Sequence, residues 1–350
     1  MDHSMKINFQ PQLPEQRFPI IIIGAGGIVR DSHLPAYQKA GFELQGIFDL
    51  NQEAAQALAD EFSIPQVFES LEQAIVASDE NTLWDMVLPA SVIIKVLNQL
   101  PDDIHVLIQK PMGENLEEAK EILDCVKRKN IRGGINFQLR YAPLAIGARD
   151  LLEQGALGDL LDMEIKVTCH TPWGLWDFLK GLPRTEILYH SIHYVDLVRS
   201  YMGEPTNILA NTVGHPDAEG IASTRTCIIM DYGPNKRAII HTNHDHKFGP
   251  DLMESYVKWE GTRGAIKAQI GVNMDYPKGR PDEFTYCLLD EASPKWKSGE
   301  LPGTWFPDAF IGPMADLMRL KAGDINAMPS SFEDAYMTME CVEQAYFGHK

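Results

Sequence analysis

Short apolar runs alternate with helical stretches through the first part of the chain. Between residues 18 and 137 they recur at spacings of about 20 to 30 residues, the rhythm of βαβ units around a parallel sheet. Ile20–Ile23 is apolar at every position, as is typical of a strand buried on both faces. We expect a helix over Asn51–Phe62 and further strands at Glu43–Phe48, Trp84–Leu88, Ile104–Ile108 and Gly133–Phe137.

The pattern changes after Tyr141. Up to there, helix starts are well marked: Ser70 and Asn115 each precede an amide or acidic residue by three positions, as in a capping box. Beyond it, β-like runs separated by turn residues predominate. We therefore predict a doubly wound α/β domain over residues 18–141 and, over 142–350, an α+β domain with a larger, mostly antiparallel open sheet. The second domain should contain helices at Leu144–Gln154, Glu186–Met202, Pro307–Lys321 and Phe332–Phe347, and a long strand at Leu160–Cys169.

Composition narrows the range of partners. The 350 residues include 31 Lys and Arg against 49 Asp and Glu, a net charge of −18, and no basic run, which disfavours nucleic acids and anionic membranes as partners. The five cysteines form no C-x-x-C pair, which argues against a disulfide framework or a zinc knot. The polar N-terminus lacks the features of a signal peptide. We expect a cytoplasmic protein with no structural metal.

The most informative motif follows the first strand. Gly24-Ala25-Gly26-Gly27-Ile28 opens a helix directly after Ile20–Ile23, where a phosphate-cradling turn is expected. Gly24 can form the tight turn, Gly26 lets a pyrophosphate approach the backbone, and the helix start offers N–H groups. Val29 stands where the G-x-G-x-x-G pattern has its third small residue.

An acidic residue lies at the expected distance from this loop. Asp49 follows Val29 by 20 residues, at the end of the second predicted strand. A carboxylate there can accept hydrogen bonds from ribose hydroxyls and repels a 2′-phosphate. The sequence therefore predicts a dinucleotide site that prefers NAD to NADP.

A lysine is expected at the same edge of the sheet. Lys110 follows the strand Ile104–Ile108 and precedes Pro111. Ligands of open α/β sheets bind at the carboxyl ends of the strands, and the residue before a proline is held extended. The ammonium group can therefore be directed at a ligand, although most lysines after strands are only solvated.

These motifs together resemble those of the glucose-fructose oxidoreductase, inositol dehydrogenase and MocA (Gfo/Idh/MocA) family. The resemblance rests on the glycine loop, Phe48-Asp49-Leu50 and the run from His105 to Pro111, and it continues through Glu260–Gly264 and Ser331–Ala335. It implies a Rossmann domain, nicotinamide-dependent hydride transfer on a sugar or cyclic polyol, and a homodimer or homotetramer formed through the open sheet. It also implies cofactor contacts at Leu88, Pro89, Gln109 and Lys110.

The chain departs from the family pattern at one position beside this lysine. The usual Glu-Lys-Pro is Gln109-Lys110-Pro111 here. Lys110 is kept, so substrate binding carries over, but the negative charge of the glutamate is absent.

The histidines at Tyr189–Asp196 are the candidate proton acceptors. Oxidation of an alcohol needs a base, and an ordinary histidine titrates near neutral pH. His193 and Asp196 match the last two members of the family's Asp-x-x-x-His-x-x-Asp pattern, whereas Tyr189 replaces the first. On an α-helix Tyr189, His193 and Asp196 would be neighbours. The resemblance thus implies His193 as the base and Lys110 as the group that polarises the substrate oxygen, with Tyr189 or His190 as alternatives for sharing the proton.

Other residues are candidates for substrate contacts. Trp173 and Trp176 can form an aromatic platform for a sugar, or pack in the core. Arg140 is a further candidate through the resemblance. The run from His241 to His246 can bind a metal, line the substrate site or form a polar sheet face. Two other functions stay open, namely a glycosidase or epimerase that oxidises transiently with bound NAD, and a non-catalytic sugar or dinucleotide sensor.

Overall fold

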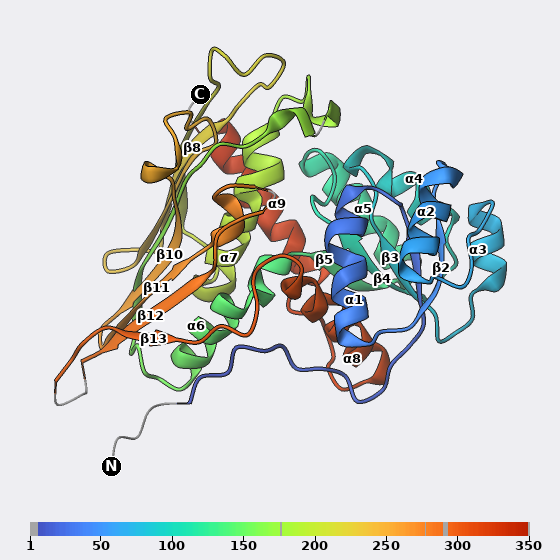
Figure 1. Cartoon of the computed structure of the whole chain (residues 1–350), viewed down its shortest axis with the longest axis horizontal. Helices are drawn as coiled ribbons and strands as arrows, with labels where there is room; N and C mark the ends of the chain where they lie inside the picture. Colours follow the sequence, from blue (N-terminus) through green and yellow to red (C-terminus); the bar gives the residue numbers. More distant parts are fainter. Residues whose placement is uncertain (1–5, 176, 277, 290–292, 349–350) are drawn as a thin grey trace. The chain divides into compact units, whose positions relative to one another are not determined.

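The computed structural model describes residues 6–175, 177–276, 278–289 and 293–348 (Figure 1). The chain divides into two compact units. One unit comprises Pro11–Tyr141 and Phe306–Met339. The other comprises Ala142–Trp305 together with segments from both chain ends.

The first unit is built on a five-stranded parallel sheet in the order β2-β1-β3-β4-β5. The apolar run predicted as the first strand forms β1, an inner strand between β2 and β3, and all four isoleucines are almost inaccessible to solvent. Burial on both faces explains why this strand is apolar throughout. The prediction of a doubly wound parallel sheet is confirmed. The strands are β1 (Ile20–Ile23), β2 (Leu44–Phe48), β3 (Leu83–Met86), β4 (His105–Gln109) and β5 (Arg132–Asn136).

Polar side chains cap the helices of this unit where the sequence predicted. Ser70 and Asn115 accept hydrogen bonds from the backbone N–H groups of Gln73 and Glu118, respectively. Such a bond satisfies one of the N–H groups that a helix start leaves without an intrahelical partner. The helices that follow the strands are α1 (Leu34–Ala40), α2 (Gln52–Phe62), α3 (Leu71–Ala77), α4 (Ile93–Gln99) and α5 (Leu116–Arg128).

A helix from the far end of the sequence completes the core of this unit. Helix α8 (Ile311–Ala322) packs against β4, and its Met314 and Leu317 belong to the same buried cluster as Ile20 and Ile22. Helix α9 (Phe332–Phe347) follows it.

The second unit is built on an eight-stranded sheet in the order β13-β12-β11-β10-β6-β9-β8-β7. Only the β6–β9 pair is parallel, so the prediction of a large, mostly antiparallel sheet is confirmed. The strands are β6 (Leu160–Thr168), β7 (Asn207–Val213), β8 (Arg225–Asp231), β9 (Arg237–Asn243), β10 (Glu254–Gly261), β11 (Gly264–Gln269), β12 (Glu283–Leu288) and β13 (Lys297–Gly299).

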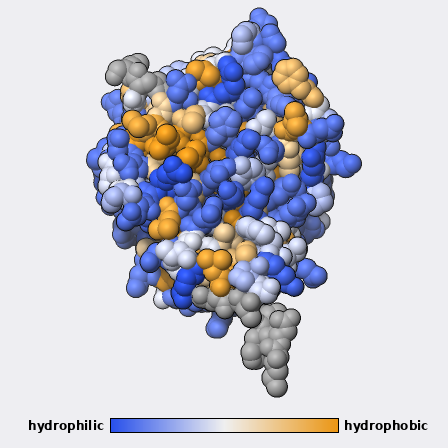
Figure 2. All heavy atoms as spheres, turned by 90° about the vertical axis from the view of Figure 1, so that its left-hand side faces the viewer, coloured by the Kyte–Doolittle hydropathy of each residue, from blue (hydrophilic) through white to orange (hydrophobic). Residues whose placement is uncertain are grey.

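The two faces of the large sheet differ. Helices α6 (Pro143–Glu153) and α7 (Ile192–Met202) cover one face (Figure 1). On the other face, polar side chains surround a group of apolar ones (Figure 2). Leu209, Val213 and Ile229 of β7 and β8 are 56%, 41% and 41% exposed, and Leu209 lies directly opposite Ile229 in the strand register. In the described part of the chain, no helix is both long enough and apolar enough to cross a bilayer.

Candidate active site

The glycine loop has the backbone geometry that a pyrophosphate cradle requires. Gly24 has a φ of 116°, and a Cβ atom there would lie 2.2 Å from the carbonyl oxygen of Val87, so only glycine fits. A Cβ on Gly26, by contrast, would meet nothing within 4 Å, which leaves open space above that backbone. Val29 is fully buried in the core, so its side chain contributes packing where the motif usually has a small residue.

Asp49 is held against this loop. Its Oδ2 accepts a hydrogen bond from the backbone N–H of Ala25 (2.7 Å), and its Oδ1 accepts one from the N–H of Asn51 (2.7 Å). Each carboxylate oxygen has a second lone pair that can accept a hydroxyl proton. The open glycine turn and the adjacent carboxylate therefore fit the pyrophosphate and ribose of a nicotinamide dinucleotide.

Lys110 lies at the same edge of the sheet, after β4. Burial lowers the pKa of Lys110 to about 8. The Lys110–Pro111 peptide bond is cis. Leu88 and Pro89 follow β3 at this edge as well, so the strand ends bring together all the residues of this unit that we expected to contact the cofactor.

Gln109 is turned into the protein. Its Oε1 accepts a hydrogen bond from the backbone N–H of Lys110 (2.8 Å), and its Nε2 lies 3.2 Å from Nε2 of His33. Because the Nε2 amide group of Gln109 can only donate, Nε2 of His33 must accept the hydrogen bond. The proton of His33 is therefore assigned to Nδ1, which lies 2.7 Å from Oδ2 of Asp85. Tyr37 donates to the same oxygen (2.7 Å), and burial raises its pKa well above the usual value. Gln109 thus connects Lys110 to a buried hydrogen-bond network.

Arg140 holds two segments of its own unit together. Its Nη1 donates to the carbonyl oxygen of Pro329 (2.7 Å), and its Nη2 contacts Asp334 (2.5 Å). These bonds give Arg140 a structural role, and a substrate contact remains a prediction.

The histidine segment of the second unit is not a regular α-helix. Ile187–Ser191 forms a π-helical turn, and α7 starts only at Ile192. Hydrogen bonds from i to i+5 replace those from i to i+4 in such a turn. Residues four and five positions apart both lie near one face of such a turn, so the expectation that Tyr189 and His193 are neighbours stays a prediction. Extra turns of this type occur often at functional sites.

The candidate residues of this segment pack against different aromatic rings. His193 is 5% exposed and packs edge-on against Trp305, with ring centroids 5.3 Å apart. Tyr189 packs against Phe178 at 5.8 Å. Trp176, a predicted substrate contact, lies outside the described residues.

His190 belongs to an aromatic cluster. Its ring centroid lies 4.7 Å from that of His244 and 5.2 Å from that of Trp173. The predicted substrate contacts Trp173 and His190 are therefore direct neighbours.

A buried carboxylate, Glu186, supports this cluster, and sequence reasoning did not identify it. Glu186 is inaccessible to solvent and accepts hydrogen bonds from the hydroxyls of Ser191 (2.7 Å), Thr242 (2.8 Å) and Thr226. Its Oε1 lies 3.3 Å from Nε2 of His244. No local pattern could have indicated the pairing, because the partners come from the start of the π-helical turn and from the end of β9.

The two groups support each other's charge. Burial alone would raise the pKa of Glu186, but His244 and the hydroxyls of Ser191 and Thr226 outweigh it and lower the pKa. Burial alone would lower the pKa of His244, but Cys169 and Glu186 raise it to about 10. The geometry is that of an ion pair rather than a metal site. Among the described residues, no group of three or more His, Cys, Asp or Glu side chains could hold a metal ion.

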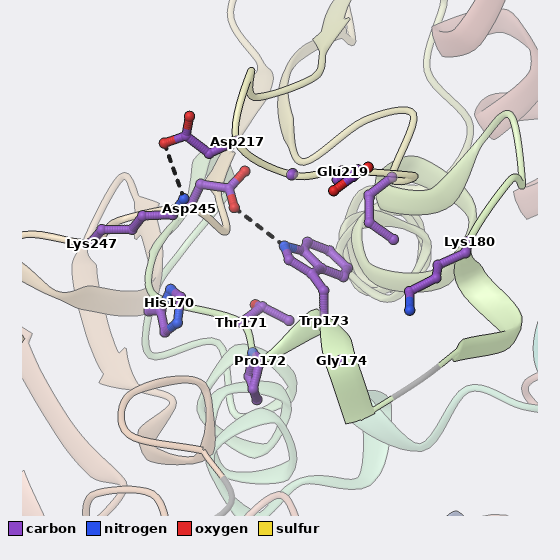
Figure 3. Close-up of a pocket in the computed structure, with 12 residues that line it drawn as sticks. His170, Thr171, Pro172, Trp173, Gly174, Lys180, Asp217, Glu219, Asp245 and Lys247 are labelled. Atoms are coloured by element: carbon purple, nitrogen blue, oxygen red, sulfur yellow. Dashed lines mark hydrogen bonds and ion pairs between the residues drawn. The ribbon is translucent and has the colours of Figure 1, made fainter.

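A pocket of about 330 Å³ lies within the second unit (Figure 3). It is lined by the segment after β6, which carries Trp173, and by residues of the connections that follow β7 and β9. Trp173 therefore both lines the pocket and contacts His190.

Comparison with known proteins agrees with these features. Residues 18–137 match the family model described as "Oxidoreductase family, NAD-binding Rossmann fold" of the Gfo/Idh/MocA proteins. D-xylose 1-dehydrogenase (NADP(+)) 2 of Haloferax volcanii is 25% identical over 257 residues, which is 73% of this chain and 76% of that protein. Glucose-6-phosphate 3-dehydrogenase of Bacillus subtilis is 31% identical over 150 residues, 41% of this chain and 40% of that protein.

Solved structures share the whole fold. An oxidoreductase from Agrobacterium radiobacter, in complex with NAD⁺, L-tartaric acid and magnesium, has a TM-score of 0.74 at 18% identity, covering 95% of this chain and 96% of the other. Levoglucosan dehydrogenase in complex with NADH and levoglucosan has a TM-score of 0.74 at 17% identity, with the same coverage. Residues 18–137 therefore match the NAD-binding Rossmann domain of the Gfo/Idh/MocA oxidoreductase family, and the whole chain shares the fold of these solved structures.

Proposed function

We propose that this protein is an NAD(H)-dependent oxidoreductase that transfers a hydride between the nicotinamide and a hydroxyl-bearing carbon of a sugar, sugar derivative or cyclic polyol. The observation that carries the proposal is the glycine loop with the Asp49 carboxylate held against it, at the sheet edge that also carries Lys110. The relatives named as xylose and glucose-6-phosphate dehydrogenases support a carbohydrate as the substrate class.

Asp49 supports NAD as the cofactor. Its carboxylate is fixed by two backbone N–H groups, so it cannot swing away from an incoming ribose without losing both hydrogen bonds. A 2′-phosphate placed beside it would be repelled. The Haloferax volcanii relative is named for NADP, so the shared fold alone does not fix the cofactor, and the proposal of NAD rests on Asp49.

Lys110 and His193 have complementary roles in the proposal. In the oxidation direction the bound nicotinamide supplies the hydride acceptor. The Lys110 ammonium donates a hydrogen bond to the substrate oxygen and stabilises the alkoxide as it forms. The imidazole of His193 accepts the hydroxyl proton while the C–H hydride leaves, so one proton and one hydride are removed from the alcohol. Tyr189 and His190, in the preceding π-helical turn, are the alternatives for sharing that proton.

The remaining predicted contacts complete the assignment. Leu88, Pro89 and Gln109 are proposed to border the cofactor, and Trp173 and His190 to border the substrate. The bonds that Gln109 makes to His33 and Lys110 suit it to fixing the backbone at Lys110.

Lys110→Ala tests the proposal. The variant should lose most sugar-dependent turnover, on the order of a hundredfold or more in kcat, because the alkoxide loses its positive partner. NAD binding, measured by calorimetry, should stay close to that of the parent. If turnover stays within a few-fold of the parent, Lys110 is not the polarising group.

A further inference from the structure

The pocket of the second unit contains a buried acidic group with an unused hydrogen-bond acceptor. Asp245 is 5% exposed and lines the pocket. Its Oδ1 accepts a hydrogen bond from the indole Nε1–H of Trp173 (3.3 Å; Figure 3). No described residue donates a hydrogen bond to its Oδ2. Because a buried carboxylate oxygen without a donor is costly, this atom indicates a ligand that supplies one.

Trp173 forms a fixed aromatic wall beside this acceptor. Its indole is held by Asp245 on one side and packs edge-on against the rings of His190 (5.2 Å) and His244 (5.8 Å). A flat ring of fixed orientation next to a hydrogen-bond acceptor suits a sugar, whose C–H face stacks on the indole while a hydroxyl donates to the carboxylate.

The charges around the pocket favour a neutral ligand. Asp217, Glu219 and Asp245 face Lys180 and Lys247, which leaves an excess of one negative charge. Lys247 is also paired with Asp217 at 3.4 Å (Figure 3). A phosphate group would meet this excess of carboxylates, whereas a neutral ring with several hydroxyls would not.

We propose that this pocket binds a neutral sugar ring that is joined by a glycosidic bond to the ring that reacts. This inference rests on the proposed function and makes it narrower, because it names a glycoside or disaccharide as the substrate class. The volume of about 330 Å³ lies at the lower end of the range for small-molecule sites. Trp173 lines the pocket and contacts His190, so a ring bound in the pocket would lie next to the histidine segment, toward which the reacting ring of a disaccharide would extend.

Measuring sugar binding directly tests the proposed role of the pocket and does not require catalysis. The probes are maltose, cellobiose, trehalose and sucrose, with glucose and glucose 6-phosphate for comparison. Binding is measured by saturation-transfer NMR and calorimetry on the full chain with NAD present. The variants are Asp245→Asn, which replaces the free acceptor by an amide, and Trp173→Ala. Trp296→Ala is the matched control, because Trp296 is 55% exposed and does not line the pocket.

The expected result is that at least one disaccharide binds more tightly than glucose and glucose 6-phosphate. Its affinity should fall roughly tenfold in Asp245→Asn and in Trp173→Ala, and stay unchanged in Trp296→Ala. Thermal unfolding and NAD titration establish that each variant is folded. Equal affinities in all four proteins, or tighter binding of glucose 6-phosphate than of any disaccharide, overturn the proposal.

The two proposals can fail separately. If monosaccharides are oxidised but no disaccharide binds, the pocket assignment is wrong and the proposed function stands. If disaccharides bind with the expected dependence on Asp245 but no sugar reduces NAD, the sugar-ring site stands as a binding site, while the proposed oxidation and the substrate role of the pocket both fail.

Discussion

Asp49 is the residue on which the choice between NAD and NADP depends. Replacing it with serine keeps a hydroxyl for the ribose but removes the negative charge. Asp49→Ser should therefore lower the preference for NAD over NADP roughly ten- to hundredfold, the range expected for one lost repulsion between nearby charges. The ratio of kcat/KM for the two cofactors measures this, with Asp60→Ser on the exposed face of α2 as the control. An unchanged ratio would contradict the assignment of Asp49.

The titration of Lys110 determines how kcat/KM is expected to change at basic pH. Its pKa is lowered to about 8, so the ammonium is present at neutral pH and is lost as the pH rises through 8. If the charge stabilises the alkoxide, kcat/KM for sugar oxidation should fall above about pH 8. In Lys110→Arg any residual activity should persist to higher pH, because a guanidinium stays protonated. A rate that keeps rising through pH 9 in the parent would mean that Lys110 acts as a base instead.

At the scale of single elements, the local signals of the sequence were reliable where one short segment decides the outcome. Ser70 and Asn115 each cap the helix predicted to follow them, and the all-isoleucine run is a buried inner strand. Each of these features depends on neighbours within a few residues, which a single sequence contains.

Features that depend on distant partners were missed. The π-helical turn at Ile187–Ser191 was not predicted, and no residue in the segment indicates it. The contact between Gln109 and His33 was also not predicted, because the two residues lie 76 positions apart in the sequence. The Glu186–His244 pair joins two segments that only tertiary packing brings together.

This buried pair should contribute strongly to stability. Glu186→Gln leaves the His244 imidazolium buried without its counter-charge, so it should lower the free energy of unfolding by about 3 kcal/mol. Urea unfolding at neutral pH measures the loss. Glu283→Gln, at the exposed start of β12, should change it by less than about 0.5 kcal/mol. A loss below about 1 kcal/mol for Glu186→Gln would contradict the ion-pair assignment.

The contribution of the Glu186–His244 pair to stability depends on pH. Glu186 has a lowered pKa in the folded state, so its contribution is present above the ordinary carboxyl pKa and is lost in acid, as the pH falls through the folded value. His244 has a raised pKa, so its contribution is complete below the ordinary histidine pKa and is lost as the pH rises toward about 10. The stability difference between the parent and Glu186→Gln should therefore shrink at low pH.

At the scale of the whole molecule, the exposed face of the large sheet is the expected site of self-association. The family resemblance implies a homodimer or homotetramer, and Leu209 and Ile229 form an exposed apolar pair on β7 and β8. The double variant Leu209→Glu, Ile229→Glu should weaken association at least about a hundredfold, because it buries like charges against each other. Sedimentation equilibrium checks this, with Val76→Glu on α3 as the control. A parent protein that stays monomeric at all concentrations would contradict the expectation.

The central claim is net hydride transfer from a carbohydrate to NAD. The most direct test follows the absorbance of reduced nicotinamide while the purified protein meets NAD, and then NADP, with a panel of aldoses, uronic acids, inositols and glycosides. We expect net reduction with NAD and at least one of these classes. No reduction with any of them, together with tightly bound nicotinamide released on denaturation, would contradict the claim and favour an enzyme that recycles its cofactor internally, or a sensor.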